Sequence, residues 1–486
     1  MTPAQIEMLD IHGAQAVRLF PTERQRLYDR FENKLEIALN LNRQVVSNQT
    51  NKVAPIYRWV KYKEGFSAEL VKYFLNKYSP KLGKLLDPFA GSGTTLFAGK
   101  ELGWDTYGIE LLPVGTFIMN ARESVSKIHP NELNTFVKSF PLRFREFDQY
   151  EEKIKHISIT KDAYPEDTEH QLNRYLTFCS TVESEELQTT LRLAAFAVLE
   201  EISYTRKDGQ YLRWDHRSKR NLSGKPFDKG EIFSFDDAIS NKLDQIVEDL
   251  LESVNPFLFG ELEPDINGGR PVNIIEGSCL KVLPGLPNDF FDFVVTSPPY
   301  CNRYDYTRTY ALELVYLGLD NDEVRNLRQT MLSCTVENKD KIEILRRSYD
   351  TIEKAGVFER ILRVYEASGA MDEVNIILEG LNEREKLNNS NIPRMVRNYF
   401  LELCFVIYEL GRVTRSGGYC VMVNDNVRYG GEEIPVDIIL SEFAENFGFE
   451  VEKIFVLPRG KGNSSQQMGE FGRSEIRKCV YLWRKL

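Results

Sequence analysis

Several kinds of site are excluded by what this 486-residue sequence lacks. Its seven cysteines form no Cys-x-x-Cys pair and no zinc-site spacing, which is typical of a chain in a reducing cytoplasm. No apolar run can span a bilayer, because the best stretch, residues 400–410, is broken by Glu402 and Glu409. The first seven residues lack a basic region followed by an apolar run, so we expect no secretory signal. The sequence therefore predicts a cytoplasmic protein without a metal site or a membrane segment.

A basic excess is also missing. The formal net charge is −10, from 62 Lys and Arg against 72 Asp and Glu. This acidic net charge argues against nonspecific binding along nucleic acid. A local basic cleft remains compatible with it, because binding follows the electrostatic field at the contact surface and not the net charge. The length favours two or three sub-domains, and the hydrophobic fraction of 42% is ordinary for a globular chain.

The order of expected strands and helices indicates an α/β protein. Residues 84–110 contain a strand, a Gly-rich turn, a helix and a second strand, which together form one βαβ unit. Strand patterns return at 272–275 and 291–296, and then at 419–423, 451–457 and 479–483. Residues 66–79 indicate an amphipathic helix with Ser67 as its N-cap. Long helical patterns interrupt the alternation, and a polar basic loop is expected at 206–225 within the first of them. We predict one doubly wound, mostly parallel sheet with two mainly helical insertions; two independent domains are the alternative.

The Gly-rich turn, Asp-Pro-Phe-Ala-Gly-Ser-Gly-Thr-Thr at residues 87–95, has the features of a nucleotide site. Only glycine takes up the backbone of such a turn without strain, and Gly91 and Gly93 leave the chain open to a ligand. The free N–H groups of the helix that starts at Thr94 suit a carboxylate. Glu110, at the end of the next strand, is placed for two ribose hydroxyls, or it is an ordinary solvated strand end. No Gly-Lys-Ser/Thr follows, which disfavours a P-loop.

A second motif, Thr296-Ser297-Pro298-Pro299-Tyr300, directly follows the strand at 291–296. Two adjacent prolines make a rigid, extended turn at the edge where open α/β sheets bind ligands. The Ser297 hydroxyl and the Pro298 carbonyl can accept hydrogen bonds, and Tyr300 can stack on a base. Taken alone, the motif would equally suit a stiff loop with a packed tyrosine.

Together these motifs resemble those of the DNA amino-methyltransferases, which modify N4 of cytosine or N6 of adenine. Residues 87–95 look like the family's cofactor motif and residues 296–300 like its catalytic motif. Residues 63–71, Lys-Glu-Gly-Phe-Ser-Ala-Glu-Leu-Val, look like its further cofactor segment. The resemblance implies a Rossmann-like fold, S-adenosyl-L-methionine as cofactor, duplex DNA with a flipped base as substrate, and direct methyl transfer without a metal.

The resemblance also implies roles for individual residues. The catalytic set is Ser297, Pro298, Pro299 and Tyr300. The cofactor-binding set is Phe66, Ser67, Asp87, Phe89, Ala90, Gly91, Ser92, Gly93, Thr94, Glu110 and Ser278. A serine at the head of the catalytic motif is usual for cytosine N4 enzymes, whereas aspartate or asparagine is usual for adenine N6 enzymes. Ser297 therefore favours cytosine.

Two further observations refine this interpretation. Gly277-Ser278-Cys279 departs from the family's Gly-Asp-Ser or Gly-Asp-Ala, so a neutral hydroxyl replaces the aspartate that contacts the cofactor's adenine. A cytosine C5 mechanism needs a cysteine nucleophile, typically in a Pro-Cys pair, and the chain contains no Pro-Cys.

Two basic stretches are predicted to contact DNA. Residues 206–225 and 459–485 each carry seven basic and two acidic residues, a local charge of +5, and Tyr211 and Trp214 interleave the first stretch. Such stretches suit phosphate contacts, base contacts or filling of the gap left by a flipped base; solvated loops are the alternative. The residues predicted to bind DNA are Arg206, Arg213, Trp214, Arg217, Lys219, Arg220, Arg303, Arg308, Arg459, Lys461 and Arg473.

These features divide the chain into six parts. They are a helical N-terminal segment (1–50), a cofactor-binding part (51–120), a helical insertion (121–268), a catalytic part (269–319), a second helical insertion (320–394) and a C-terminal part (395–486). By analogy the first insertion reads the target sequence, and the second competes for that role.

The sequence thus predicts a site-specific cytosine-N4 DNA methyltransferase of restriction-modification or phage defence. Its alternatives are adenine N6 methylation, methylation of an amino group in structured RNA, and a catalytically silent DNA-binding subunit. A cognate restriction endonuclease is left open as a partner, and one asymmetric chain is compatible with a monomer.

Overall fold

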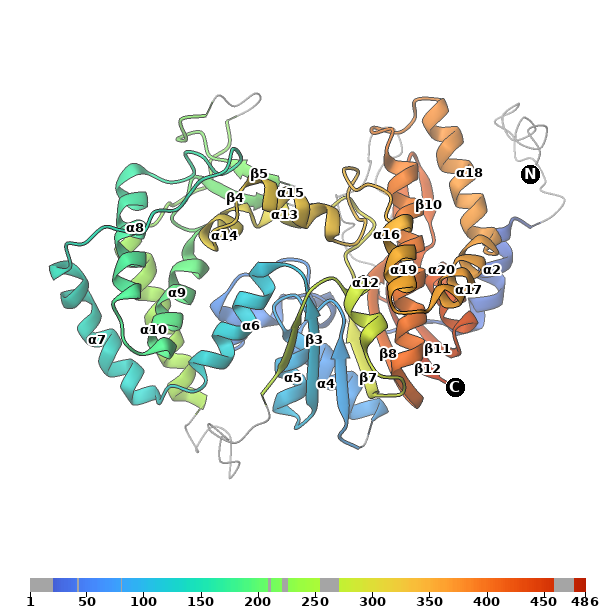
Figure 1. Ribbon diagram of the computed structural model, residues 1–486, viewed down its shortest axis with the longest axis horizontal. Coiled ribbons are helices and arrows are strands. Elements are labelled where there is room, and N and C mark those ends of the chain that lie inside the picture. The colour runs from blue at the N-terminus through green and yellow to red at the C-terminus, as the bar shows by residue number, and fades with distance from the viewer. Residues whose placement is uncertain are drawn as a thin grey trace.

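A central eight-stranded sheet organises the molecule (Figure 1). The computed structural model describes residues 21–41, 43–79, 81–208, 211–220, 226–253, 271–458 and 476–486. The strand order is β1-β11-β12-β8-β7-β2-β3-β6, and only β12 runs antiparallel to its neighbours among the paired strands of this sheet. The strands are β1 (Leu35–Ile37), β2 (Lys84–Asp87), β3 (Asp105–Glu110), β6 (Asn273–Glu276), β7 (Phe291–Thr296), β8 (Thr414–Asp425), β11 (Phe449–Val456) and β12 (Lys478–Lys485). The predicted α/β fold with a mostly parallel sheet is confirmed.

The strand order reverses between β2 and β7. From β2 the chain proceeds outward through β3 to β6, and it then returns to place β7 on the other side of β2. Leu85 and Leu86 of β2 pair in parallel with Phe293 and Val294 of β7. Ligands of open α/β sheets bind beyond the carboxyl ends of the strands at such a reversal. The Gly-rich turn after β2 and the Ser-Pro-Pro-Tyr motif after β7 both lie at this position.

Both faces of the sheet are buried, because successive side chains along a strand point to opposite faces. Leu86 and Val294 belong to one core cluster, whereas Leu85 and Val295 belong to the other. The helices of the second face are α4 (Ala68–Tyr78) and α5 (Thr94–Glu101). Those of the first face are α2 (Glu23–Phe31), α12 (Cys279–Val282), α17 (Ala355–Glu366), α18 (Gly369–Glu383), α19 (Ile392–Val413) and α20 (Val436–Asn446).

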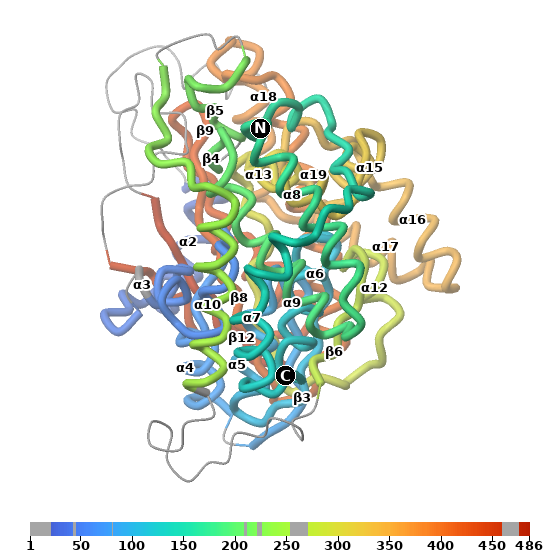
Figure 2. Tube along the Cα trace, turned by 90° about the vertical axis from the view of Figure 1, so that its left-hand side faces the viewer, coloured from blue at the N-terminus to red at the C-terminus, as the bar shows by residue number. Residues whose placement is uncertain are grey.

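A lobe of helices with its own hydrophobic core stands beside the sheet (Figures 1 and 2). Tyr175, Phe196 and Leu243 are fully buried in this core. The lobe contains α6 (Pro113–Val125), α7 (Pro130–Glu146), α8 (Glu166–Ser180), α9 (Glu185–Val198), α10 (Phe235–Ser253) and α14 (Ala311–Tyr316). It therefore groups residues before and after the catalytic motif into one unit.

The basic stretch at 206–225 corrects a prediction, because its first part is a hairpin and not a loop. Strand β4 (Thr205–Asp208) pairs in antiparallel fashion with β5 (Tyr211–Trp214) on the upper side of the molecule in Figure 1. Each strand has only four residues, and one buried position is Lys207. Such a segment has no hydrophobic alternation that a sequence reading could detect.

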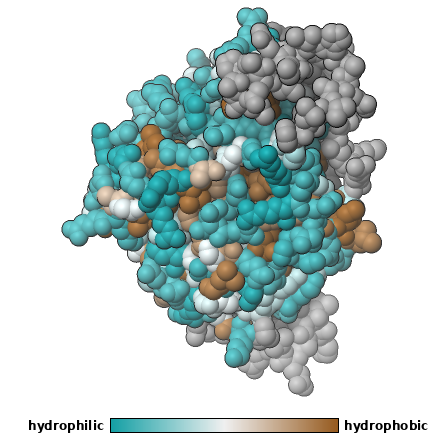
Figure 3. Space-filling model, turned by 90° about the vertical axis from the view of Figure 1, so that its right-hand side faces the viewer, coloured by the Kyte–Doolittle hydropathy of each residue, from teal (hydrophilic) through white to brown (hydrophobic). Residues whose placement is uncertain are grey.

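The second predicted helical region includes α15 (Asn321–Thr330) and α16 (Ile342–Thr351), followed by α17 and α18. A short helix, α13 (Tyr306–Thr309), precedes it directly after the catalytic motif. Helices α17 and α18 pack on α19 and contribute to the core of the sheet. The face that carries α2, α17 and α18 is mainly hydrophilic, with small groups of apolar side chains between (Figure 3). The apolar sides of these helices are therefore turned inward.

The N-terminal segment, predicted as helical, also contains a strand. After α2, β1 forms the edge of the sheet and pairs in parallel with β11. Its three residues are too few to show an alternating hydrophobic pattern in the sequence. The strand is defined by its pairing with β11, some four hundred positions further along the chain. The remaining short elements are η1 (Glu32–Lys34), α3 (Arg43–Val46), η2 (Thr50–Lys52), η3 (Tyr57–Trp59), η4 (Leu283–Gly285), β9 (Val427–Tyr429) and β10 (Glu432–Ile434).

Other local predictions are confirmed. The helix expected at residues 66–79 is α4, and the Ser67 hydroxyl caps it by accepting a hydrogen bond from the Leu70 N–H at 3.2 Å. The expected closing strands at 451–457 and 479–483 are the antiparallel pair β11 and β12. Within the described parts of the chain, no helix is both long and apolar enough to cross a membrane.

A buried ion pair joins the segment before α16 to α19. The Lys341 Nζ lies 2.9 and 3.1 Å from the two carboxylate oxygens of Glu402, and the two side chains are 6% and 1% exposed. Glu402 also accepts a hydrogen bond from the Ser333 N–H at 2.8 Å. Removing one partner would leave the other as an uncompensated buried charge.

We expect Lys341→Met to lower the free energy of unfolding by about 3–5 kcal/mol. The double variant Lys341→Met, Glu402→Gln should recover part of this loss, because the glutamine is neutral and can still accept from Ser333. The measurement is the midpoint of chemical unfolding followed by circular dichroism. A double variant less stable than Lys341→Met alone would contradict the assignment.

Candidate active site

A pocket with about 590 Å³ of empty space, part of it open to solvent, lies where the two motifs meet. Four groups of lining residues come from distant parts of the chain: Pro88, Phe89 and Gly91 after β2; Ile109 to Leu112 at the end of β3; Gly277 to Cys279 after β6; and Ser297 and Pro299 after β7. The fold therefore brings the predicted cofactor and catalytic motifs to one cavity.

Asp87, the last residue of β2, holds the two motifs together. Its carboxylate accepts hydrogen bonds from the Thr95 hydroxyl at 2.7 Å, the Phe89 N–H at 3.0 Å and the Thr296 hydroxyl at 2.6 Å. The first two donors belong to the Gly-rich turn and its helix, and the third belongs to the catalytic strand. Burial raises the pKa of Asp87 to about 6, although these three donors lower it.

Glu110, the last residue of β3, is fixed by two backbone donors. One carboxylate oxygen accepts from the Gly91 N–H and the other from the Leu112 N–H, each at 2.6 Å. Burial raises the pKa of Glu110 to about 7, and the two backbone hydrogen bonds lower it only partly. Because Glu110 lines the pocket, it is a half-buried pocket residue and not a solvated strand end.

The glycines of the turn are required by geometry. Gly93 has a φ of +81° as the N-cap of α5, and a Cβ there would lie 2.6 Å from the Cγ of Met119. Gly91 has a φ of +54°, and a Cβ there would lie 3.2 Å from the ring of Tyr62. Side chains at these positions would be strained, and at Gly91 one would also enter the wall of the pocket.

The catalytic motif runs as extended backbone out of β7, and its serine is held by the neighbouring strand. The Ser297 Oγ lies 3.0 Å from the carbonyl oxygen of Val423 in β8 and 3.3 Å from the Tyr300 hydroxyl. When the Ser297 hydroxyl donates its hydrogen to the Val423 carbonyl, its oxygen can still accept hydrogen bonds through its lone pairs. Tyr300 is half-buried, and burial raises its pKa well above the usual value, so the phenol is neutral.

Tyr62, Met331 and Leu332 line the pocket and were not singled out from the sequence, and no role was predicted for Glu64 within the cofactor segment 63–71. Tyr306, which follows the catalytic motif, lines the pocket as well. Glu64 has a φ of +63°, which is uncommon for a residue with a side chain. Desolvation raises the pKa of its carboxyl group, with a further contribution from Asp425, although the residue is exposed by its surface area. The cofactor segment predicted at residues 63–71 was the local signal for this wall.

Most of the remaining cofactor-set residues lie around the pocket and not in its lining. Phe66 is 5% exposed in the core beside α4, and Ser67 caps that helix. Ala90 donates its N–H to the Ile109 carbonyl, whereas the carbonyl of Ser92 accepts from Arg122. Thr94 is 8% exposed at the start of α5. Ser278 does line the pocket.

The predicted DNA-binding residues fall into three groups. Arg217, Arg220, Arg303 and Arg308 bind other parts of the protein: Arg217 pairs with Asp215, Arg220 lies over Trp214 at 3.8 Å, Arg303 donates to Asn388, and Arg308 pairs with Glu337. Trp214 is thus covered by Arg220. Arg206, Arg213 and Lys219 are exposed, as is Arg217 despite its ion pair. Arg459, Lys461 and Arg473 lie outside the described residues.

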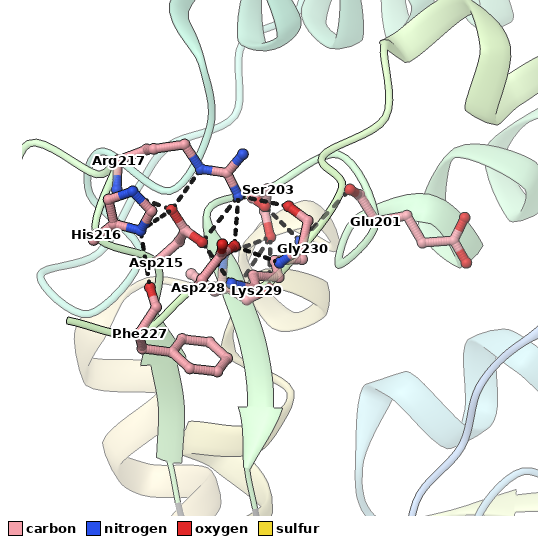
Figure 4. A network of polar contacts seen from close by, with 10 residues as sticks. Glu201, Ser203, Asp215, His216, Arg217, Phe227, Asp228, Lys229 and Gly230 are labelled. Atoms are coloured by element: carbon pink, nitrogen blue, oxygen red, sulfur yellow. Dashed lines mark hydrogen bonds and ion pairs between the residues drawn. The ribbon is translucent and has the colours of Figure 1, made fainter. Parts of the chain in front are cut away.

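A polar network fixes the chain that follows the hairpin (Figure 4). Arg217 donates to both carboxylate oxygens of Asp215, at 2.7 and 2.9 Å, and the Lys229 N–H donates to the same group at 2.7 Å. Asp215, His216 and Asp228 are close enough to hold a cation. Because the guanidinium of Arg217 already occupies both oxygens of Asp215, the network is better explained as an ion pair that shapes the loop.

Cys279 is the cysteine in the pocket lining. Burial raises the pKa of its thiol, and the same holds for Cys301 beside Tyr300. Both thiols are therefore neutral, whereas a covalent mechanism at a cytosine ring would require a thiolate.

Comparisons with known proteins agree with this geometry. The model of a family described as DNA methylase matches residues 15–114, which include the Gly-rich turn. The type II methyltransferase M.AvaI of Nostoc sp. is 45% identical over 466 residues, 94% of this chain and 92% of its own. The type II methyltransferase M.BsoBI of Geobacillus stearothermophilus is 40% identical over 482 residues, 95% of this chain and 92% of its own.

A more distant relative is the type II methyltransferase M.MvaI of Kocuria varians, 23% identical over 436 residues, 85% of this chain and 87% of its own. The comparison with solved structures gave no match. The relatives span nearly the whole chain, and the pocket joins the two motifs that this class of enzyme needs. The chain therefore belongs to the DNA amino-methyltransferase family.

Proposed function

We propose that this protein transfers a methyl group from S-adenosyl-L-methionine to N4 of a flipped cytosine at a specific site in duplex DNA. The observation that carries this proposal is Ser297, which heads the catalytic motif at the border of the pocket that also contains the Gly-rich turn. The type II relatives support a role in a restriction-modification system.

The donor set of the pocket fits the proposed cofactor. Glu110 is held for the ribose hydroxyls, Ser278 and the apolar side chains of Ile109 and Leu112 suit the adenine, and Gly91 leaves room for the chain between them. When bound, the cofactor would supply an electrophilic methyl group on a sulfonium. The Glu64 carboxylate, also in the lining, would balance positive charge in the pocket.

The catalytic motif suits an exocyclic amine. The lone pair of such an amine is delocalised into the aromatic ring, so the amine is a weak nucleophile. The Ser297 oxygen and the Pro298 carbonyl would accept its two N–H groups and draw it toward tetrahedral geometry. Tyr300 would stack on the extruded base, which at ~1–3 kcal/mol per base offsets part of an unstacking cost of a few kcal/mol.

The identity of the methylated base tests the proposal. Purified protein, S-adenosyl-L-methionine and mixed-sequence duplex DNA should yield N4-methylcytosine, detected by mass spectrometry of the nucleosides. Tyr300→Ala should lower the rate by at least about tenfold because the stacking ring is lost, whereas Tyr300→Phe, which keeps the ring, should retain most activity.

N6-methyladenine as product would keep the site and the chemistry but overturn the choice of base. An absence of any methylated nucleoside, on DNA that contains all short sites, would instead favour an RNA substrate or a catalytically silent subunit.

Cofactor binding should depend on pH through Glu110. A raised pKa means that this carboxyl is protonated below about 7 and ionised above it, and the ionised form is the one that accepts at both oxygens. We expect the Kd for S-adenosyl-L-methionine, measured by calorimetry, to increase about tenfold from pH 8 to pH 6. Asp87, with a pKa of about 6, should add to the loss below pH 6.

The matched control is Glu110→Gln, which cannot ionise. It should bind more weakly at pH 8 and lose most of the dependence between pH 6 and pH 8. An equally steep pH dependence in this variant would assign the titration to another group.

A further inference from the structure

The exposed face of the β4–β5 hairpin combines two arginines, an aspartate and a tyrosine. Strand pairing places Arg206 directly opposite Arg213, and Asp208 opposite Tyr211. All four side chains are exposed, Tyr211 by 52%, whereas Thr205, Lys207 and Leu212 on the other face are buried. The hairpin is thus a two-stranded ribbon with one polar outer face.

The outer face carries positive charge that the protein neutralises only in part. Like charges directly opposite one another destabilise a strand pair. Arg206 makes no hydrogen bond or ion pair within the described parts of the chain. The guanidinium of Arg213 lies 4.0 Å from the ring centroid of Phe227 and 3.7 Å from a carboxylate oxygen of Asp208. In a chain with a net charge of −10, this exposed arginine pair indicates an anionic partner.

The inner face of the ribbon is firmly anchored. The Lys207 ammonium pairs with Glu313 of α14, both side chains being 4% exposed, and lies 4.6 Å from the ring centroid of Tyr310. Beyond β5, the network around Asp215 and Arg217 fixes the chain that leaves the hairpin (Figure 4). A rigid support of this kind allows exposed side chains to make contacts of defined geometry.

The anchor also connects the ribbon to the pocket. The ring of Tyr310 stacks on that of Tyr62 with centroids 5.1 Å apart, and its hydroxyl accepts from the Lys63 N–H at 2.7 Å. Tyr62 lines the pocket, and α13, which follows the catalytic motif, packs against β5. The ribbon and Ser297 can therefore act on the same stretch of DNA.

We propose that the β4–β5 ribbon enters the major groove of the target DNA and that Arg206 and Arg213 read guanines there. This inference rests on the proposed function. The major groove admits a two-stranded ribbon, and arginine pairs with O6 and N7 of guanine through two hydrogen bonds. Asp208 adds an acceptor suited to N4 of cytosine. The Asp208 carboxylate on the same face, 3.7 Å from the Arg213 guanidinium, favours base edges over phosphates, which would repel it.

The test uses the full-length protein and a duplex with its target site. The site is defined by sequencing the methylated products and, independently, by selecting bound duplexes from a random pool. Fluorescence anisotropy then gives Kd for the target and for single base-pair changes. Arg206→Ala and Arg213→Ala should each reduce discrimination at one G·C pair by about 5- to 150-fold and leave the other positions unchanged.

Modified bases identify the groove. At the position that a variant no longer reads, 7-deazaguanine, which lacks the N7 acceptor, should weaken binding of the wild type but not of that variant. Inosine there, which lacks only the minor-groove amino group, should leave both unchanged. Arg415→Ala is the matched control, because this exposed arginine lies at the opposite end of β7 and β8, next to Asp292.

Three results would overturn the inference. The first is an equal loss of affinity of the arginine variants for target and altered duplexes, which would mark phosphate contacts. The second is wild-type binding that 7-deazaguanine does not weaken. The third is binding that inosine does change. Methylation is a separate outcome. If the wild-type protein binds its selected site but produces no methylated base, the proposed function is rejected, and the binding test of the ribbon remains valid. Unchanged thermal melting of the variants would exclude unfolding as the cause.

Discussion

The carboxylate of Asp87 is the interaction on which the site depends. It is 1% exposed and joins the Gly-rich turn, through Thr95 and Phe89, to the catalytic strand, through Thr296. Thr296 immediately precedes Ser297, so one buried group sets the distance between the place where a cofactor would lie and the acceptor of the substrate amine. Two neighbouring parallel strands alone would align these segments only coarsely; the three hydrogen bonds fix their relative position.

A pocket built in this way has three carboxyl groups in or beside it. Burial raises the pKa of Asp87 and of the half-buried Glu110, and desolvation also raises that of Glu64, which is more exposed. A cation in the pocket would stabilise all three, whereas an anion would be repelled. Under the proposed function the protein would separate its two polar ligands, with a cationic cofactor in the interior at the strand ends and polyanionic DNA at the exposed arginines of the ribbon.

The two regions are nevertheless joined by direct contacts. Lys207 of the ribbon reaches Glu313 and the ring of Tyr310, and Tyr310 stacks on Tyr62 in the wall of the pocket. Because buried side chains pack at high density, a displaced ribbon cannot leave this wall in place. The helical lobe thus provides a fixed frame that holds the ribbon at a set position relative to Ser297.

The sequence by itself determined the features that depend on local backbone chemistry. These are the strand–turn–helix around Gly91 and Gly93, the rigid turn after β7, the cap at Ser67 and the mostly parallel α/β fold. Tertiary structure decided the rest. It brings Asp87 to Thr296 across 209 positions, and it pairs the strands of β1 and of the β4–β5 hairpin. It also places Tyr62 and Glu64 in the lining of the pocket and gives four predicted DNA-binding arginines partners within the protein. The reason is physical. A φ angle or a helix cap depends on residues within one turn of chain, whereas burial and ion pairing depend on neighbours that only the completed fold supplies.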